Sequence, residues 1–427
     1  MRWLSDSVKW AAIANMAAQI IGMLGQLIFI PIYLHAWGGE KYGSWMICVG
    51  VTAYAAILDF GVSQAASNEM IASIAKRDQK TAQIWSSLAF WVAIGMSLAV
   101  GLMGICAAPY AIDFLGNRLG AGDSSQALYF CVVIQLALLV TFNMYICLIR
   151  AAGANATASW ISVLAIFLEV VIPPCIALGG GTLAQAAAGL VVPRLLGLVI
   201  CGYALRALAP WATVTVASRE YLVRAKEILI PSAANLLQPG GVALFLQGSL
   251  VVIGSMLGPQ VAAAFGVART VSRLPFQLCY VFTRAQMPNL TKSISASDKE
   301  GFLRSFKPVV LIYFCLTVPM LFCFAIFGEW FLRAWTHETL SFSFALVGGL
   351  ALCSVLHSGW HMLSAPLVAR NLHGGFSVAY FVLVSVSLCA LNAMPNLASC
   401  VALIAIMEFF ALIVSWRQFK SLVFLRF

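Results

Sequence analysis

Residues 11–34 read AAIANMAAQIIGMLGQLIFIPIYL, an apolar stretch without a charged side chain. Because about 20 such residues cross the hydrocarbon core of a bilayer as a helix, this stretch predicts a transmembrane span. The residues before it, Met1 to Trp10, hold Arg2, Asp6 and Lys9 and are not followed by a small-residue cleavage site. We therefore expect a retained first helix rather than a cleaved signal peptide.

Eleven further apolar runs follow, each long enough to cross a bilayer. They lie at residues 43–68, 85–110, 127–149, 159–178, 183–205, 228–257, 260–288, 308–328, 342–364, 375–394 and 397–416. Lipid leaves no backbone group unpaired, so each run is expected to be helical. The sequence therefore predicts an all-α membrane protein with about 12 transmembrane helices.

The composition agrees with a chain solvated by lipid. Of 427 residues, 62% are hydrophobic and 9% are charged, and the mean hydropathy is +0.94. A soluble domain carries about 25% charged residues. The 12 cysteines stand singly in apolar runs without ligand-like spacing to histidine, so we interpret them as small buried hydrophobic side chains.

The basic residues predict the orientation. Of the 25 lysines and arginines, nineteen fall in the two ends and the connections on one side of the predicted spans. Three others, Lys41, Arg118 and Arg333, fall in the connections on the opposite side. Since basic residues mark cytoplasmic loops, both termini are expected in the cytoplasm. The formal net charge of +10 is then a topology signal and requires no nucleic-acid partner.

The longest polar link divides the spans six and six. We expect an N-terminal six-helix lobe at 1–207, a cytoplasmic linker at 208–227 and a C-terminal six-helix lobe at 228–427. An offset of about 220 places Gly38 on Gly258 and Asp78 on Asp298. A repeat of this kind is typical of transporters, with a central cavity between the lobes as the substrate site.

Charged residues inside the predicted spans are the candidate site residues. A charge at the bilayer centre costs about 2.5 to 3.5 kcal/mol, so such a residue faces a cavity or a partner. Arg269 and Arg273 lie four residues apart on one helix face, and Arg284 lies further towards the cytoplasm. With Arg194, they form a candidate binding set for an anionic substrate. The alternative is that these arginines only pair with acids and hold the bundle together.

Three acids in the spans, Asp59, Glu169 and Glu408, are the alternative ion-pair partners and also candidate coupling sites for a proton or a sodium ion. His357 and His361 share a helix face, but no third ligand accompanies them, so we expect a proton-responsive or polar pair and no metal. No phosphate-binding loop for ATP is present, and no cofactor is expected. An intramembrane glycan-modifying transferase would need acids at a membrane face, and the outer loops hold only scattered ones.

The segment 32–45, IYLHAWGGEKYGSW, followed by Tyr54 and by LDFGVS at 58–63, resembles the Wzx-type O-antigen and polysaccharide flippases. These belong to the multidrug/oligosaccharidyl-lipid/polysaccharide (MOP) exporter superfamily. The matching patterns are an LG-x-E-x-YG turn and an LLD-x-G helix. Here Trp37 replaces the leucine of the turn and Ile57 precedes Leu58, which are mild departures.

The resemblance implies a MATE-like fold and a function. The protein would flip an undecaprenyl-diphosphate-linked oligosaccharide, such as an O-antigen or other surface polysaccharide repeat unit, to the periplasmic leaflet of a bacterial inner membrane. Arg194, Arg269 and Arg273 would form the cationic cavity of the family, with Arg284 at its inner mouth. Its partners would be the lipid-linked glycan, membrane lipids, a polysaccharide polymerase and a chain-length regulator.

Two other transporter classes are alternatives. A cation-coupled multidrug exporter of the same superfamily also has twelve spans, but it should line its cavity with acids, whereas three arginines accompany the three acids here. A flippase for peptidoglycan precursor usually carries fourteen spans, which twelve runs disfavour.

Overall fold

The computed structural model describes residues 6–50, 66–67, 69–71, 73–74, 77–118, 125–212, 237–369 and 372–426. The described residues form helices and turns and no strand, which confirms the predicted all-α class. The chain divides into two compact units, Met1–Leu236 and Leu237–Phe427, which we call the N-terminal and C-terminal units. Residues 213–236 lie outside the described part, so the predicted linker and the predicted cavity between lobes stay predictions.

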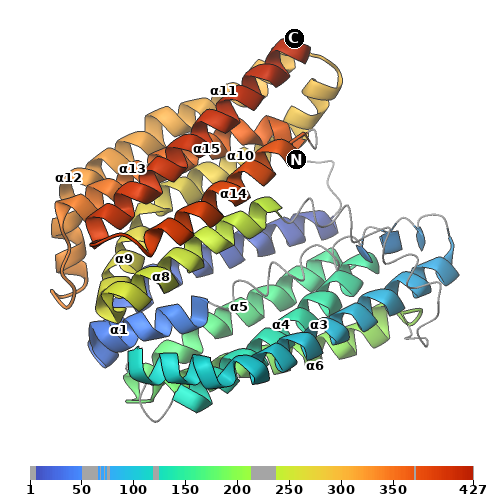
Figure 1. The fold of residues 1–427 in the computed structure, drawn as a ribbon. Helices are drawn as coiled ribbons and strands as arrows, with labels where there is room; N and C mark the ends of the chain where they lie inside the picture. The colour runs from blue at the N-terminus through green and yellow to red at the C-terminus, as the bar shows by residue number, and fades with distance from the viewer. Residues whose placement is uncertain are drawn as a thin grey trace. The chain divides into compact units, whose positions relative to one another are not determined.

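The N-terminal unit is a bundle of long helices (Figure 1). Helix α1 packs against α5, α5 against α6, and α4 against both α3 and α6. The bounds are Asp6–Gly50 for α1, Gln79–Asp113 for α3, Ser125–Ala151 for α4, Asn155–Leu178 for α5 and Leu183–Leu208 for α6. A short π-helix, η1, continues α3 over Phe114–Arg118.

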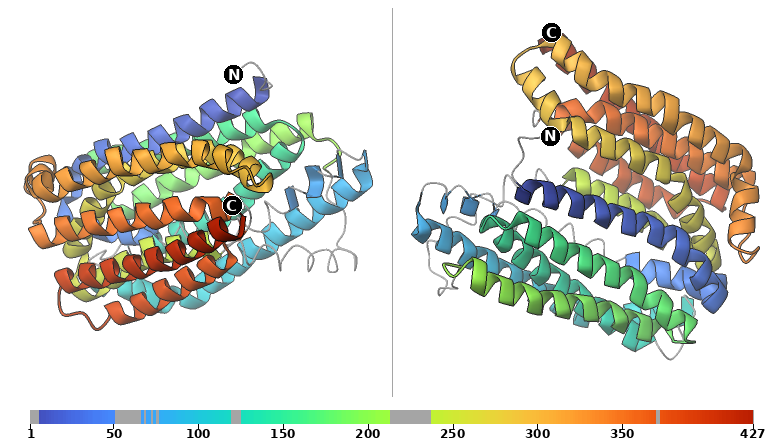
Figure 2. Two further views of the ribbon diagram at one scale, coloured as in Figure 1. Left: turned by 90° about the horizontal axis from the view of Figure 1, so that it is seen from above. Right: turned by 180° about the vertical axis from the view of Figure 1, so that it is seen from behind.

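The C-terminal unit is built around helix α13, which contacts α9, α10, α12 and α15 (Figure 2). Its first helix runs over Leu237–Leu257 and contains the π-helix η3. The bounds are Leu244–Gly248 for η3, Ser249–Leu257 for α8, Pro259–Ser272 for α9, Leu274–Ser295 for α10, Lys299–Ile312 for α11, Tyr313–Thr317 for η4, Val318–Trp335 for α12, Phe344–Ala369 for α13, Gly374–Leu391 for α14 and Leu397–Arg426 for α15.

Ten helices in the described part of the chain are long and apolar enough to cross a membrane. They correspond to ten of the twelve predicted spans. Most of the second predicted span, 43–68, lies outside the described residues. The eighth, 260–288, is found as two consecutive helices, α9 and α10, which meet at Arg273. Pro275 follows this junction and lacks the amide that would continue the hydrogen-bond pattern of α9.

The backbone repeats itself at the predicted offset. Helix α1 is interrupted at Gly38 (φ 73°, ψ 174°), and Gly258, 220 residues later, has nearly the same conformation (φ 92°, ψ 162°). The turn after residue 73 recurs after residue 293: Asp78 N donates to the carbonyl of Ser73 at 3.0 Å, and Asp298 N to that of Ser293 at 2.9 Å. The two units therefore share these two local backbone features at an offset of 220 residues.

Candidate functional site

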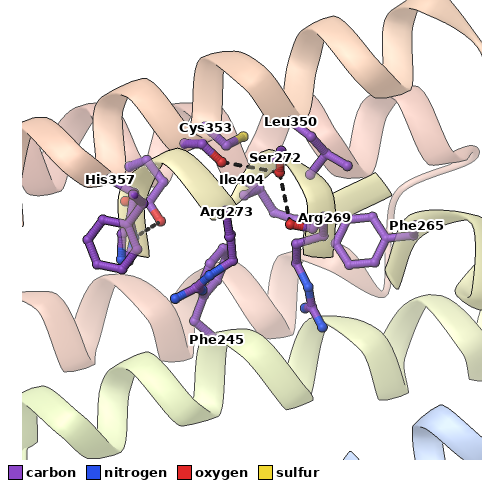
Figure 3. A pocket seen from close by; sticks show the side chains of 12 residues that line it. Phe245, Phe265, Arg269, Ser272, Arg273, Leu350, Cys353, His357 and Ile404 are labelled. Atoms are coloured by element: carbon purple, nitrogen blue, oxygen red, sulfur yellow. Dashed lines mark hydrogen bonds and ion pairs between the residues drawn. The ribbon is translucent and has the colours of Figure 1, made fainter. Parts of the chain in front are cut away.

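Arg269 and Arg273 lie on one face of α9, as the sequence predicted. Arg269 is in the last turn of α9, and the amide of Arg273 donates to the Arg269 carbonyl at 3.1 Å. Gln277 N donates to the Arg273 carbonyl at 3.0 Å, so the helical pattern continues into α10. Figure 3 shows the two guanidinium groups extending in the same direction from this helix.

Arg269 is fixed by hydrogen bonds to neutral groups. Its Nη1 donates to the backbone carbonyl of Leu246 and, at 3.1 Å, to Oγ of Ser249. Its guanidinium also lies over an aromatic ring, with Cζ 5.1 Å from the centroid of Phe265. Leu246 belongs to the π-helix η3, where the regular hydrogen-bond pattern is interrupted and a carbonyl can accept from a side chain. The side chain is thereby oriented without losing its positive charge.

Arg273 is held less firmly. Its Cζ lies 5.4 Å from the ring centroid of Phe276, and Glu408 and Tyr380 are near enough to interact with it electrostatically. Within the described part of the chain, its guanidinium has no hydrogen-bond or ion-pair partner. The residue as a whole is partly exposed.

Glu408 lies beside these arginines in a hydrogen-bonded cluster. It is 1% exposed, and its Oε1 is 2.9 Å from Nδ1 of His357. Trp360 donates its Nε1–H to Oε2 of Glu408 at 2.6 Å. The ring of Tyr380 packs against Trp360 with a centroid distance of 4.8 Å. Both carboxylate oxygens of Glu408 therefore have a partner, as a buried carboxylate requires.

A small cavity joins the two features. Its lining includes Arg269, Arg273, His357 and Glu408, with Phe245, Phe265 and Phe276 among the apolar residues (Figure 3). The space open to the centre of a water molecule is about 20 Å³, enough for one or two waters. An oligosaccharide does not fit inside it.

Arg194 lies in the N-terminal unit and pairs with Glu169. Nε of Arg194 is 2.5 Å from Oε1 of Glu169, and Nη2 donates to Oε2 at 2.8 Å. The arginine Cζ also lies 5.0 Å from the ring centroid of Phe142. Glu169 was one of three acids that the sequence offered as an ion-pair partner. The pair joins α5 to α6.

Two predicted site residues are not placed by the structure. Asp59 lies outside the described residues. The backbone of Arg284 belongs to α10, but its side chain is not described. Their proposed roles therefore stay predictions.

The two histidines of α13, His357 and His361, contact different side chains. His357 contacts Glu408, whereas His361 packs against Tyr280 and Phe276, with ring centroid distances of 5.1 and 5.2 Å. Among the described residues, no group of three His, Cys, Asp or Glu side chains could hold a metal ion.

Sequence reasoning missed the neutral groups of the site. Trp360, Ser249 and the carbonyl of Leu246 all bind a predicted charged residue, yet none was singled out. Trp360 offered a signal, because a buried indole usually finds an acceptor for its N–H. The Leu246 carbonyl offered none, because a π-helix is not visible in the hydropathy pattern.

Residues 10–294 match a sequence model of the family described as polysaccharide biosynthesis protein. The chain belongs to this family. Membership confirms the resemblance drawn from residues 32–63, and the family is part of the MOP superfamily. No curated protein matches the chain by sequence.

The fold of this family member is that of MATE transporters. It is similar to an inward-facing multidrug resistance MATE family transporter of the MOP superfamily, with a TM-score of 0.75 and 16% identity over 96% of this chain and 98% of that one. The outward-facing conformation of a multidrug resistance MATE family transporter matches with a TM-score of 0.65 and 15% identity, over 97% of this chain and 96% of that one. A MOP superfamily transporter from Pyrococcus furiosus Vc1 matches with a TM-score of 0.64 and 16% identity, over 97% of this chain and 95% of that one. The family member is thus a MOP-type transporter with a MATE-like fold.

Proposed function

We propose that this transporter flips a lipid-linked oligosaccharide with a diphosphate headgroup, such as an undecaprenyl-diphosphate-linked repeat unit of a surface polysaccharide. Export would run from the cytoplasmic to the periplasmic leaflet of a bacterial inner membrane, with both termini in the cytoplasm. The family match to polysaccharide biosynthesis supports a glycan substrate. The finer choice of a diphosphate headgroup rests on the chemistry of α9.

The observation that carries the proposal is the guanidinium of Arg273, which has no ion-pair or hydrogen-bond partner among the described residues, beside the hydrogen-bonded guanidinium of Arg269. Arginine presents several N–H donors in a planar fork that matches phosphate oxygens. A diphosphate would lose its hydration on entering the membrane, and these donors would replace part of it. The lipid tail would remain in the hydrocarbon core of the bilayer, so its transfer into water would be avoided.

The binding pocket of the Pyrococcus furiosus transporter is described as having reverse polarity, with a suggested different function. In this chain, two arginines and one carboxylate line the cavity, which differs from the acid-lined cavity expected of a cation exporter and supports an anionic substrate. Arg194 and Arg284 are proposed as further contacts of the anionic glycan. For Arg194, binding would require its pair with Glu169 to open or to admit a third partner.

The test is complementation of a flippase-null strain that lacks surface polysaccharide. We expect Arg273→Ala to reduce surface polymer by at least about tenfold, because a hydrogen bond to a charged group contributes about 1.5–3 kcal/mol. The lipid-linked precursor should accumulate in the membrane. Arg273→Lys should restore part of the export, since it keeps the charge and loses the fork.

Arg304→Ala is the matched control, because Arg304 is an exposed arginine on α11 of the same unit. It should export as wild type does. Immunoblotting of membranes would show whether each variant is inserted at wild-type abundance. Wild-type polymer from Arg273→Ala would contradict the proposed anion site. A change in resistance to cationic drugs, with polymer unchanged, would favour a multidrug exporter instead.

A further inference from the structure

Tyr380 of α14 is a fully buried tyrosine whose hydroxyl is unpaired. The residue is 0% exposed. Its Oη forms no hydrogen bond with any residue that the structure describes. Because a buried hydroxyl without a partner costs free energy, such a group in a folded protein requires an explanation.

Packing explains the ring of Tyr380 and leaves its hydroxyl unexplained. The ring centroid lies 4.8 Å from that of Trp360 and 5.8 Å from that of Phe376. A Cβ built on Gly241 would lie 2.9 Å from Cδ1 of Tyr380, so the missing side chain of Gly241 makes room for the ring. Phe376, four residues earlier on α14, is also 0% exposed and has no hydroxyl. A phenylalanine at position 380 would therefore pack in the same way.

The hydroxyl lies near a second polar group without a partner, the guanidinium of Arg273. The two groups are close enough to interact electrostatically, but no hydrogen bond joins them. Glu408 also lies within electrostatic range of Tyr380, but its two carboxylate oxygens are bonded to His357 and Trp360. An arginine can only donate hydrogen bonds, and a tyrosine hydroxyl can donate one. Two donors near one another are thus left without an acceptor among the described residues.

An anionic oxygen is the acceptor that suits both donors. A phosphate group accepts several hydrogen bonds at once, and bonds to an ionised acceptor are about twice as strong as those between neutral groups. The cavity lined by Arg273 has about 20 Å³ open to the centre of a water molecule, which is room for one phosphate oxygen. Two arginines and one carboxylate line it, so its charge favours an anion over a cation.

We propose that Tyr380 is a second hydrogen-bond donor of the anion site, whose O–H donates to the phosphate group that the guanidinium of Arg273 binds. This rests on the proposed function, because it takes a phosphate-bearing headgroup as the ligand. It adds a neutral contact from α14 to the arginines of α9 and of its junction with α10. The hydroxyl is unpaired in the free protein and becomes paired when the ligand binds. Removing it should therefore weaken binding without weakening the fold.

The experiment uses the purified full-length protein in detergent micelles, with inorganic pyrophosphate as the probe. The dissociation constant is measured by calorimetry, and the midpoint of thermal unfolding is measured without pyrophosphate. We expect Tyr380→Phe to bind pyrophosphate at least about tenfold more weakly than wild type, because it loses a hydrogen bond to a charged group. Its midpoint of unfolding should equal or exceed that of wild type, since the substitution removes an unpaired buried hydroxyl and keeps the ring.

Tyr313→Phe is the matched control, because Tyr313 is a buried tyrosine of the same unit whose Oη donates to the carbonyl of Val355 at 3.2 Å. It should lower the midpoint of unfolding and leave the affinity for pyrophosphate unchanged.

Two results would overturn the tyrosine contact and leave the anion site intact. One is wild-type affinity in Tyr380→Phe with binding lost in Arg273→Ala, since the hydroxyl would then bind only water. The other is a lower midpoint of unfolding in Tyr380→Phe, which would show that the hydroxyl stabilises the free protein. Absence of pyrophosphate binding by wild type, or equal binding by Arg273→Ala, would overturn the anion site as well.

Discussion

At the scale of single residues, the buried charges of this transporter divide into paired and available ones. Arg194 with Glu169 and Glu408 with His357 each satisfy one another inside a unit. Arg273 has an aromatic contact and no such pair among the described residues. Because an unpaired cation in a membrane helix is expensive, its presence is better explained by a ligand than by packing.

The Arg194–Glu169 pair can be tested for a purely structural role. Replacing Arg194 by Leu alone leaves a buried carboxylate unpaired, and we expect a loss of about 3–5 kcal/mol in stability. Replacing both residues by Leu should recover most of that loss, because an apolar pair needs no desolvation of charge. Thermal unfolding in detergent measures both variants.

The same two variants separate stability from function. If Arg194 also binds the anionic glycan, the double variant should be folded and still deficient in polysaccharide export. Full export by a stable double variant would show that the pair only holds α5 against α6.

Trp360 provides a second test of a buried charge. Its Nε1–H is one of two donors to Glu408, so Trp360→Phe should leave one carboxylate oxygen without its partner. We expect a cost of about 1–3 kcal/mol, seen as a lower midpoint of thermal unfolding in detergent. Trp330→Phe is the control, because Trp330 is 73% exposed, and it should change the midpoint little. Equal midpoints for the two variants would argue against the hydrogen bond.

At the scale of helices, the interruptions are as informative as the spans. Gly38 and Gly258 both adopt a positive φ with an extended ψ, a region that is essentially restricted to glycine. No atom lies within 4 Å of a Cβ built on either residue, so a substitution there would strain the backbone without a steric clash. The same backbone conformation therefore occurs at equivalent positions of the two units, 220 residues apart.

We expect Gly38→Ala and Gly258→Ala each to destabilise the protein by about 1–3 kcal/mol through backbone strain alone. Gly22→Ala and Gly202→Ala are matched controls, since they also have open space at Cβ but lie within helices at ordinary φ. Alanine there should be neutral or slightly stabilising. Thermal unfolding of the four variants in one detergent would decide, and equal midpoints would refute the argument.

The sequence predicted the positions of the helices better than the side-chain contacts between them. Runs of apolar residues gave the spans, because a bilayer demands about 20 of them whatever packs beside them. The offset of 220 was visible in Gly38 and Gly258 because only glycine tolerates that backbone. Hydropathy could not show that Glu408 would bind His357 and Trp360, since those contacts depend on the rotation of α13 against α15.

At the scale of the whole molecule, charge in the connections and charge in the spans answer different questions. Nineteen lysines and arginines on one side predict how the chain is inserted. The few arginines inside the spans predict what it carries. Membership of the polysaccharide biosynthesis family agrees with the second inference at the level of the transporter class.

The predicted insertion can be tested with two reporters placed in turns of the C-terminal unit. Residues 336–343 join α12 to α13, and residues 296–298 join α10 to α11. The first turn lies on the predicted outer side, so alkaline phosphatase inserted there should be active, since it folds only in the oxidising periplasm. The same enzyme at 296–298 should be inactive, and green fluorescent protein at the C-terminus should fluoresce. The reversed pattern would invert the topology and would place the face bearing most of the positive charge in the periplasm.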